Sequence, residues 1–243
     1  MFKHLAFLIL VVLLACASIR AQQPSQAGTL ASQKIAAAGG GIAFDAASLA
    51  SFTGNTTTSF NHTCTGSNLL LFVTVTHRFA SLVTVNAPTY NGVTMTLVAE
   101  PFESDGEFQV HLYRLIAPAT GTHSVTVTFS GTPADYELGA TSFTGVHQTT
   151  PLGTPVTATG NSSAISGTIS SASGEWGFDA VVWQTSVTDG ATADSGQTER
   201  NNKLGITSGL GNSTKDGAAS VVMSWTISAS HRWATVVVPI KPA

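Results

Sequence analysis

The chain has 243 residues, of which 43% are hydrophobic and only 9% are charged, with 10 basic against 13 acidic side chains. Because nucleic-acid binding rests on clustered lysine and arginine, this sparse and slightly acidic charge argues against nucleic acid as a partner. The length suits one large β domain or two small ones.

The first residues have the three-part pattern of a secretory signal peptide. A basic start, Met1-Phe2-Lys3-His4, precedes an uncharged run over residues 5–14 and then the small residues Ala15-Cys16-Ala17-Ser18. The apolar run is shorter than the roughly 20 residues that a bilayer-spanning helix needs. We therefore predict a leader over residues 1–21, with the cleavage position open between residues 17 and 21, and a secreted or cell-surface protein.

The end of the leader raises an alternative, which is a lipid anchor. Leu13-Leu14-Ala15-Cys16 resembles the lipobox of bacterial lipoproteins, in which the cysteine becomes the acylated first residue. Leu14 departs from the small residue usual before Ala-Cys, so we expect a membrane tether only if Cys16 is lipidated. After the leader is removed, Cys64 is the one cysteine in the sequence, so no intrachain disulfide is expected. Cys64 is then either a buried small hydrophobe or a thiol available to a partner.

Residues 22–41 are predicted to form a flexible tether. They begin with Gln-Gln-Pro-Ser-Gln and end with Gly39-Gly40-Gly41, with an alanine-rich stretch between. Such a composition buries too little apolar surface to offset the entropy lost on ordering. We predict a single β-sandwich domain over residues 42–243.

From residue 42 onward the dominant signal is alternation with a period of two, which places successive side chains on opposite faces of a sheet. Residues 68–77 combine an apolar run with such alternation. Residues 83–90 and 93–100 flank Asn91-Gly92, and this dipeptide predicts a hairpin because both turn residues need positive φ.

Further alternating segments predict half-buried strands at residues 108–113 and 125–130, and more strands follow at residues 136–146, 164–171, 175–184, 221–227 and 233–240. The total is ten to twelve strands, with no amphipathic helix. This pattern predicts an all-β fold, a two-sheet antiparallel β-sandwich of jelly-roll type. The Pro- and Gly-rich residues 149–163 are expected to cross between the sheets, and the alternative is that they divide two subdomains.

Short pieces spread over residues 42–242 resemble a broad group of uncharacterised bacterial extracellular β-sandwich domains. The pieces are turn and core signatures: Tyr90-Asn91-Gly92-Val93, Leu112-Tyr113-Arg114-Leu115-Ile116-Ala117-Pro118, Ser142-Phe143-Thr144-Gly145-Val146, Ser224-Trp225, Trp233-Ala234 and Val237-Val238-Pro239-Ile240-Lys241-Pro242. The resemblance implies an extracellular jelly-roll or immunoglobulin-like sandwich. It brings no functional residues with it.

Aromatic and polar side chains on a few strands point to a binding site for sugar. A flat ring covers the C–H face of a sugar while neighbouring polar groups bind its hydroxyls. The alternative for Trp233 is that it pins the last strand to the core, and for Asp179 that it lies near a solvated sheet end. The candidate ligand-binding residues are Trp233, His231, Arg232, Trp183, Asp179, Gln109, His111 and Tyr113.

One loop also has the composition of a calcium site. Glu103, Asp105 and Glu107 place three carboxylates close together, and calcium prefers such oxygen ligands. A structural calcium is one interpretation of this loop, and a solvated hairpin loop is the other. Asp189 and Asp194 form a second acidic loop with the same two interpretations. No other cofactor is expected.

The sequence contains no recognisable catalytic set. It lacks the Gly-x-Ser-x-Gly turn of a serine nucleophile, and the nearest similar stretch, around Ser142, has a strand pattern and the wrong spacing. Glycoside hydrolysis needs two carboxylates facing each other across a cleft. Glu100, Glu175 and Asp179 are the candidates, but acidic residues are few and lie mostly in predicted turns.

These observations predict an exported, non-catalytic binding or adhesion module for an extracellular glycan or a surface protein. Self-association is the first alternative, because exposed strand edges would let copies pair in a surface layer, fibre or matrix. A secreted polysaccharide hydrolase is the second alternative.

Overall fold

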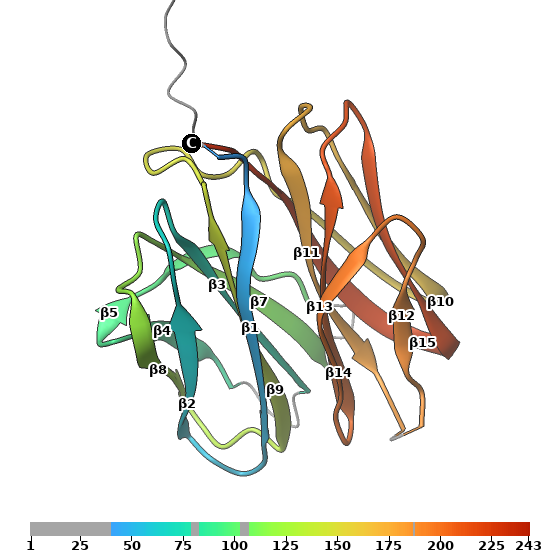
Figure 1. Ribbon diagram of the computed structural model, residues 1–243. Helices are drawn as coiled ribbons and strands as arrows, with labels where there is room; N and C mark the ends of the chain where they lie inside the picture. The colour runs from blue at the N-terminus through green and yellow to red at the C-terminus, as the bar shows by residue number, and fades with distance from the viewer. Residues whose placement is uncertain (1–39, 79–82, 103–106, 187) are drawn as a thin grey trace, which may run out of the picture. The chain divides into compact units, whose positions relative to one another are not determined.

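The computed structural model describes residues 40–78, 83–102, 107–186 and 188–243. Within these residues the fold is all-β, with fifteen strands in three antiparallel sheets (Figure 1). The antiparallel β-sandwich class predicted from the period-two alternation is confirmed, with three sheets where two were expected. The described residues belong to one compact unit, Gly39–Ala243.

Two of the sheets form a jelly roll. The central sheet has the strand order β1-β9-β3-β7-β6, and the small sheet has the order β2-β8-β4-β5. The chain passes back and forth between these two sheets, as in a jelly roll, with β6 added at one edge. Their strands are β1 Ala43–Phe52, β2 Thr57–Cys64, β3 Leu70–Arg78, β4 Val85–Tyr90, β5 Val93–Thr94, β6 Thr96–Ala99, β7 Phe108–Ile116, β8 Gly121–Phe129 and β9 Asp135–Thr144.

The predicted hairpin at Asn91-Gly92 is confirmed. The two residues have φ values of 50° and 76°, and Tyr90 pairs with Val93 across the turn. The segment after the turn does not stay in one sheet, because β5 pairs with β4 in the small sheet and β6 pairs with β7 in the central sheet. The chain therefore changes sheets at Met95, whose side chain is buried.

The third, C-terminal sheet has the order β10-β15-β11-β14-β13, with β12 paired to β15. This sheet folds over itself, because residues 233–240 of β15 pair with β11 while residues 225–227 pair with β12. The first half of β15 thus lies over the face of β11 that points away from the central sheet, and the Trp225 indole contacts Asp179 there. The strands are β10 Val156–Ile169, β11 Trp176–Gln184, β12 Ala191–Ala193, β13 Thr198–Leu204, β14 Ser208–Asp216 and β15 Val221–Ile240.

The crossover predicted at residues 149–163 is shorter than expected. Residues 145–155 connect β9 of the central sheet to β10 of the C-terminal sheet, and residues 156–163 already belong to β10. The two flanks of the crossover share one core, which lies between the central and C-terminal sheets.

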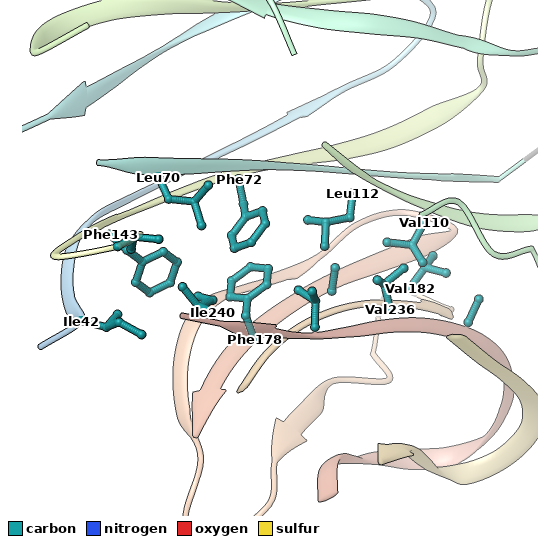
Figure 2. Packing of buried hydrophobic residues seen from close by; sticks show 14 of the residues in the cluster. Ile42, Leu70, Phe72, Val110, Leu112, Phe143, Phe178, Val182, Val236 and Ile240 are labelled. Carbon is teal, nitrogen blue, oxygen red and sulfur yellow. The ribbon is translucent and has the colours of Figure 1, made fainter. Parts of the chain in front are cut away.

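That core is built from aromatic and aliphatic side chains that point toward one another from the two sheets (Figure 2). Phe72 of β3 and Phe178 of β11 stack with their ring centroids 4.6 Å apart, and Phe143 of β9 meets both rings edge-on. Since burying one such side chain contributes about 1.5–3 kcal/mol, this cluster holds the two sheets together.

The opposite face of the central sheet is buried against the small sheet. Leu71, Val73 and Val75 of β3 pack there, so β3 is covered on both faces. Double coverage explains the continuous apolar run at the start of this strand. It also corrects the expectation that β7 is half-buried, because His111 and Tyr113 on its polar face are only 4% and 3% exposed.

Candidate functional site

Beside the apolar core, the central and C-terminal sheets meet through buried polar side chains. Asn212 of β14 donates from Nδ2 to Thr74 Oγ1 at 3.1 Å, and Asn201 of β13 donates from Nδ2 to Thr141 Oγ1 at 2.9 Å. Gly139 of β9 makes room for both amides, which lie where a side chain would otherwise be. We call this set the polar seam: Thr74, Thr76, Glu137, Thr141, Asn201, Ser208 and Asn212.

At Glu137 the polar seam borders a cleft of about 380 Å³. This volume falls within the range of small-molecule sites in proteins, about 300–1,000 Å³. The ring of Phe52 is half-buried and stacks on Tyr136 at a centroid distance of 5.7 Å. We call the space the Glu137 cleft, and its walls come from the end of β1, the start of β9 and the turn after β13: Ser51, Phe52, Thr53, Asp135, Glu137, Lys203, Leu204, Gly205 and Ile206.

Asp135 fixes the wall that the turn between β13 and β14 forms. Its Oδ2 accepts hydrogen bonds from the backbone N–H groups of Ile206, at 3.0 Å, and Thr207, at 2.8 Å. The Thr207 hydroxyl donates to the same oxygen at 3.2 Å. These bonds tie the start of β9 to the turn, so Asp135 shapes the cleft.

Glu137 is completely buried and lines the same cleft. Its Oε2 accepts from Ser208 Oγ at 2.7 Å and from Thr76 Oγ1 at 3.3 Å, whereas Oε1 has no hydrogen-bond partner within the described residues. Burial raises the pKa of Glu137 to about 8, and the charge of Asp135 adds to this effect against the hydrogen bonds and Lys203. The carboxyl is therefore mainly protonated at neutral pH and has a hydrogen bond to donate.

Trp183 and Trp233, predicted as sugar-binding residues, pair across β11 and β15 and lie in a core cluster of the C-terminal sheet. They are 0% and 7% exposed. The Trp183 indole N–H donates to the Asp189 carbonyl at 2.9 Å, and the Trp233 indole N–H donates to Ser162 Oγ at 3.0 Å. With rings and donors both engaged inside the protein, neither residue offers an open platform to a sugar.

His231 and Arg232, the neighbours of Trp233, make contacts that fasten β15 to loops. His231 Nε2 lies 2.9 Å from Asp189 Oδ2. Arg232 Nη1 donates to Glu107 Oε2 at 3.0 Å, and Arg78 Nη2 lies 3.9 Å from the same oxygen. These three contacts do not belong to the Glu137 cleft.

The predicted polar face of β7 faces the small sheet instead of solvent. His111 Nε2 lies 3.0 Å from His77 Nε2 and 3.1 Å from Gln109 Oε1, and His111 Nδ1 lies 3.2 Å from Glu100 Oε2. Burial lowers the pKa of His111 to about 4 and the pKa of His77 well below its ordinary value. His111 and Tyr113 are therefore buried and Gln109 is partly buried, and all three lie apart from the Glu137 cleft.

Asp179 lies inside the C-terminal sheet and not near a solvated sheet end. It accepts from the Ser213 backbone N–H at 2.6 Å, from Ser213 Oγ at 2.9 Å and from the Trp225 indole at 2.8 Å. Burial raises the pKa of Asp179 to about 7, while the bonds from Trp225 and Ser213 lower it. Asp179 thus joins β11, β14 and the first half of β15.

Two of the three carboxylates predicted to bind calcium, Glu103 and Asp105, lie outside the described residues. The third, Glu107, contacts Arg232 and Arg78. In the part of the chain that the structure describes, no three His, Cys, Asp or Glu side chains form a group that could hold a metal ion. The calcium site in this loop stays a prediction.

A chain of Ser, His and Asp side chains that the sequence did not reveal lies where β1 meets β2. Asp45 Oδ2 accepts from Ser142 Oγ at 2.7 Å, Ser142 Oγ lies 3.0 Å from His62 Nε2, and His62 Nδ1 lies 3.0 Å from Ser48 Oγ. Burial lowers the pKa of His62 to about 4, so the ring is neutral. In a catalytic triad the carboxylate orients the histidine, whereas here it contacts a serine. This arrangement is therefore not that of a triad.

The Glu137 cleft was not predicted, because one of its walls has only a weak signal in the sequence. Asp135 and Glu137 share one face at the start of a predicted strand, and two acidic side chains at alternate positions before an apolar run were the available hint. The opposite wall belongs to β13 and the turn after it. Strands β13 and β14 were not predicted, because residues 198–216 are rich in Asn, Gly and Ser and lack apolar alternation.

Compared with known proteins, the chain matches no family model, no curated protein and no solved structure. The resemblance to bacterial extracellular sandwich domains stays a prediction. No helix of the described residues has the length and apolar character needed to cross a membrane. Cys16 lies outside these residues, so its lipidation also stays a prediction.

Proposed function

We propose that the protein is an exported, non-catalytic binding module that holds a sugar unit of an extracellular glycan in the Glu137 cleft. The observation that carries the proposal is the buried carboxyl of Glu137, whose Oε1 has no partner within the described residues and which borders a cleft of about 380 Å³. An unsatisfied buried polar atom costs about 1–3 kcal/mol. Gly205, in the turn that forms one wall of the cleft, lies against Oε1, so a ligand hydroxyl that shifts this turn and reaches Oε1 would remove this cost.

The walls of the cleft suit a sugar better than an apolar ligand. Ser51 and Thr53 contribute exposed hydroxyls, and Lys203 contributes an ammonium group. The half-buried ring of Phe52 is available to the C–H face of a sugar. Sugar hydroxyls both donate and accept hydrogen bonds, so they match this mixture of donors and acceptors.

The same geometry favours binding over hydrolysis. A glycosidase of the usual kind needs a carboxylic acid and a second carboxylate that acts as base or nucleophile. Glu137 has the protonated carboxyl, but Oδ2 of Asp135 is engaged by the turn that contains Ile206 and Thr207. Asp135 is therefore a poor second catalytic group.

The test is binding of the purified protein to a panel of soluble polysaccharides, followed by calorimetry with the best ligand. Phe52→Ala removes the half-buried ring that lines the cleft and should weaken binding at least about tenfold, a loss of about 1.4 kcal/mol. Val93→Ala, which changes an exposed side chain in β5, is the matched control and should bind like the wild type. The proposal fails if no polymer binds, or if Phe52→Ala and the wild type bind equally well.

A second readout uses the protonation of Glu137. Wild-type affinity should fall as the pH rises through about 8, where the carboxyl loses its proton. Glu137→Gln keeps a neutral side chain with a donor, so its affinity should stay constant over the same range. If the affinities of the two proteins change in parallel with pH, Glu137 does not contact the ligand.

A further inference from the structure

A second, smaller pocket of about 130 Å³ lies near the other end of β13. The Glu137 cleft includes the end of this strand and the turn after it, whereas the second pocket includes its start. Strand β1 (blue in Figure 1), which carries Phe44, neighbours β13 (orange), so the Phe44 ring lies beside Arg200. We call this space the Arg200 pocket, and its walls are Trp176, Gly196, Thr198, Arg200, Thr214, Lys215 and Asp216.

The guanidinium of Arg200 is held in place by contacts with two rings and a hydroxyl. It lies 4.4 Å from the ring centroid of Phe44 and 5.7 Å from that of Trp176. Its Nε donates to Thr214 Oγ1 at 2.9 Å. A planar guanidinium that is stacked and hydrogen-bonded in this way is pre-organised for a further partner.

The N–H groups on the two terminal nitrogens of Arg200, Nη1 and Nη2, are available to a ligand. Among the residues that the structure describes, neither terminal nitrogen has a hydrogen-bond acceptor or an acidic ion-pair partner. Asp216 lines the same pocket without forming an ion pair with Arg200 there. Two parallel N–H groups on one edge of a guanidinium match the two oxygens of a carboxylate.

We propose that the Arg200 pocket binds the carboxylate of an acidic sugar, a uronic acid, in the glycan that occupies the Glu137 cleft. This inference rests on the proposed function. Trp176 is half-exposed beside Arg200 and offers a ring to the same sugar, and Lys215 supplies a second cation. At about 3.3 Å per residue, the stretch of β13 from Arg200 to Gly205 separates the two sites by roughly 15–20 Å, so the ligand is a chain.

The overall charge of the protein makes this pocket necessary for an acidic ligand. Without residues 1–21 the chain carries 8 basic and 13 acidic side chains, a net charge of −5. An anionic polymer is repelled by such a protein unless a local cationic site holds it. Retention of an acidic glycan therefore reports on a local site and not on general attraction.

The experiment is affinity electrophoresis of the purified protein in gels that contain polygalacturonate, the same polymer fully methyl-esterified, or dextran sulfate. We expect retardation by polygalacturonate and a loss of at least about tenfold in affinity on esterification. The affinity of Arg200→Gln for polygalacturonate should be lower than that of the wild type by a similar factor. Arg114→Gln, which removes the same charge from β7, should behave like the wild type, and thermal melting should show that both variants are folded.

Four results would overturn the inference: no retardation in polygalacturonate, equal retardation by the esterified polymer, retardation by dextran sulfate alone, or equal affinity of Arg200→Gln and the wild type. The Phe52→Ala variant distinguishes the two proposals in the same gels. If Phe52→Ala loses affinity for both forms of the polymer while Arg200→Gln keeps its affinity for both, the proposal for the Glu137 cleft is supported and that for the Arg200 pocket is wrong. If Arg200→Gln loses affinity for polygalacturonate and Phe52→Ala does not, the proposal for the Arg200 pocket is supported and that for the Glu137 cleft is wrong.

Discussion

The buried carboxyl of Glu137 should make folding stability fall as the pH rises, and Glu137→Gln should remove this effect. The pKa of Glu137 is about 8 in the folded protein against an ordinary value of 4.5. Between these values the unfolded chain releases the proton that the folded chain keeps. Stability from this group is therefore complete below about pH 4.5 and lost as the pH rises through about 8. At about 1.4 kcal/mol per pH unit, the loss reaches about 5 kcal/mol at most.

Other buried groups define the pH range in which Glu137 is best measured. Burial lowers the pKa of His62 and His111 to about 4, so the stability that they contribute is present above about pH 6.5 and lost as the pH falls. Burial raises the pKa of Asp179 to about 7, so its effect has the same sign as that of Glu137 but is nearly finished above that pH. Between about pH 7 and pH 8.5 Glu137 dominates, with a loss of about 1–2 kcal/mol.

The assay is urea unfolding followed by tryptophan fluorescence at several pH values in this range. The wild-type free energy of unfolding should fall with pH, while that of Glu137→Gln should stay nearly flat. Glu175→Gln, which removes a carboxylate from the loop before β11, controls for the loss of one negative charge and should keep the wild-type slope. If the wild-type and Glu137→Gln curves run parallel, Glu137 is not the buried, protonated acid described above.

Three further outcomes test the assignment of individual side chains. Trp233→Ala should lower the free energy of unfolding by about 3–5 kcal/mol in urea titrations, because the ring is in the core, and should leave glycan affinity unchanged; the reverse pattern would return Trp233 to the binding site. Asp179→Ala leaves three buried donors unpaired and should cost about 3–5 kcal/mol, so a loss below about 1 kcal/mol in thermal or urea unfolding would contradict its role as a joint. Burial raises the pKa of the Cys64 thiol, so maleimide should label it only in the unfolded protein, and rapid labelling of the native protein by mass spectrometry would refute its burial.

The fold class could be predicted because it depends on a local property of the sequence. Alternation at residues 125–129 and 221–227 places apolar side chains on one face, and the structure buries Val125, Val127, Trp225 and Ile227 as this pattern indicates. The turn at Asn91 was also a local signal. The third sheet could not be deduced in this way, because β13 and β14 carry polar sequences that become strands only by pairing with neighbours.

The candidate site depends on packing between residues far apart in the chain, so local sequence patterns could not predict it. Aromatic residues were expected to bind ligand, but Trp183 and Trp233 entered a core that forms only when the C-terminal sheet folds over itself. Trp176 and Phe52, which the sequence did not single out, remain half-exposed. The pKa of Glu137 is raised because packing between β9 and strands far along the chain buries its carboxyl, and the hydrogen bond from Ser208 opposes this rise.

The late place of β15 in the chain leaves one face of the central sheet uncovered during synthesis. Strand β15 lies inside the C-terminal sheet, between β10 and β11, and follows all the jelly-roll strands in the chain. A growing chain thus completes the jelly-roll strands first, while the face that bears Phe72 and Phe143 still lacks its cover. Until β11 and β15 have been synthesised, this apolar surface stays open to other chains, so the unfinished polypeptide is prone to aggregation.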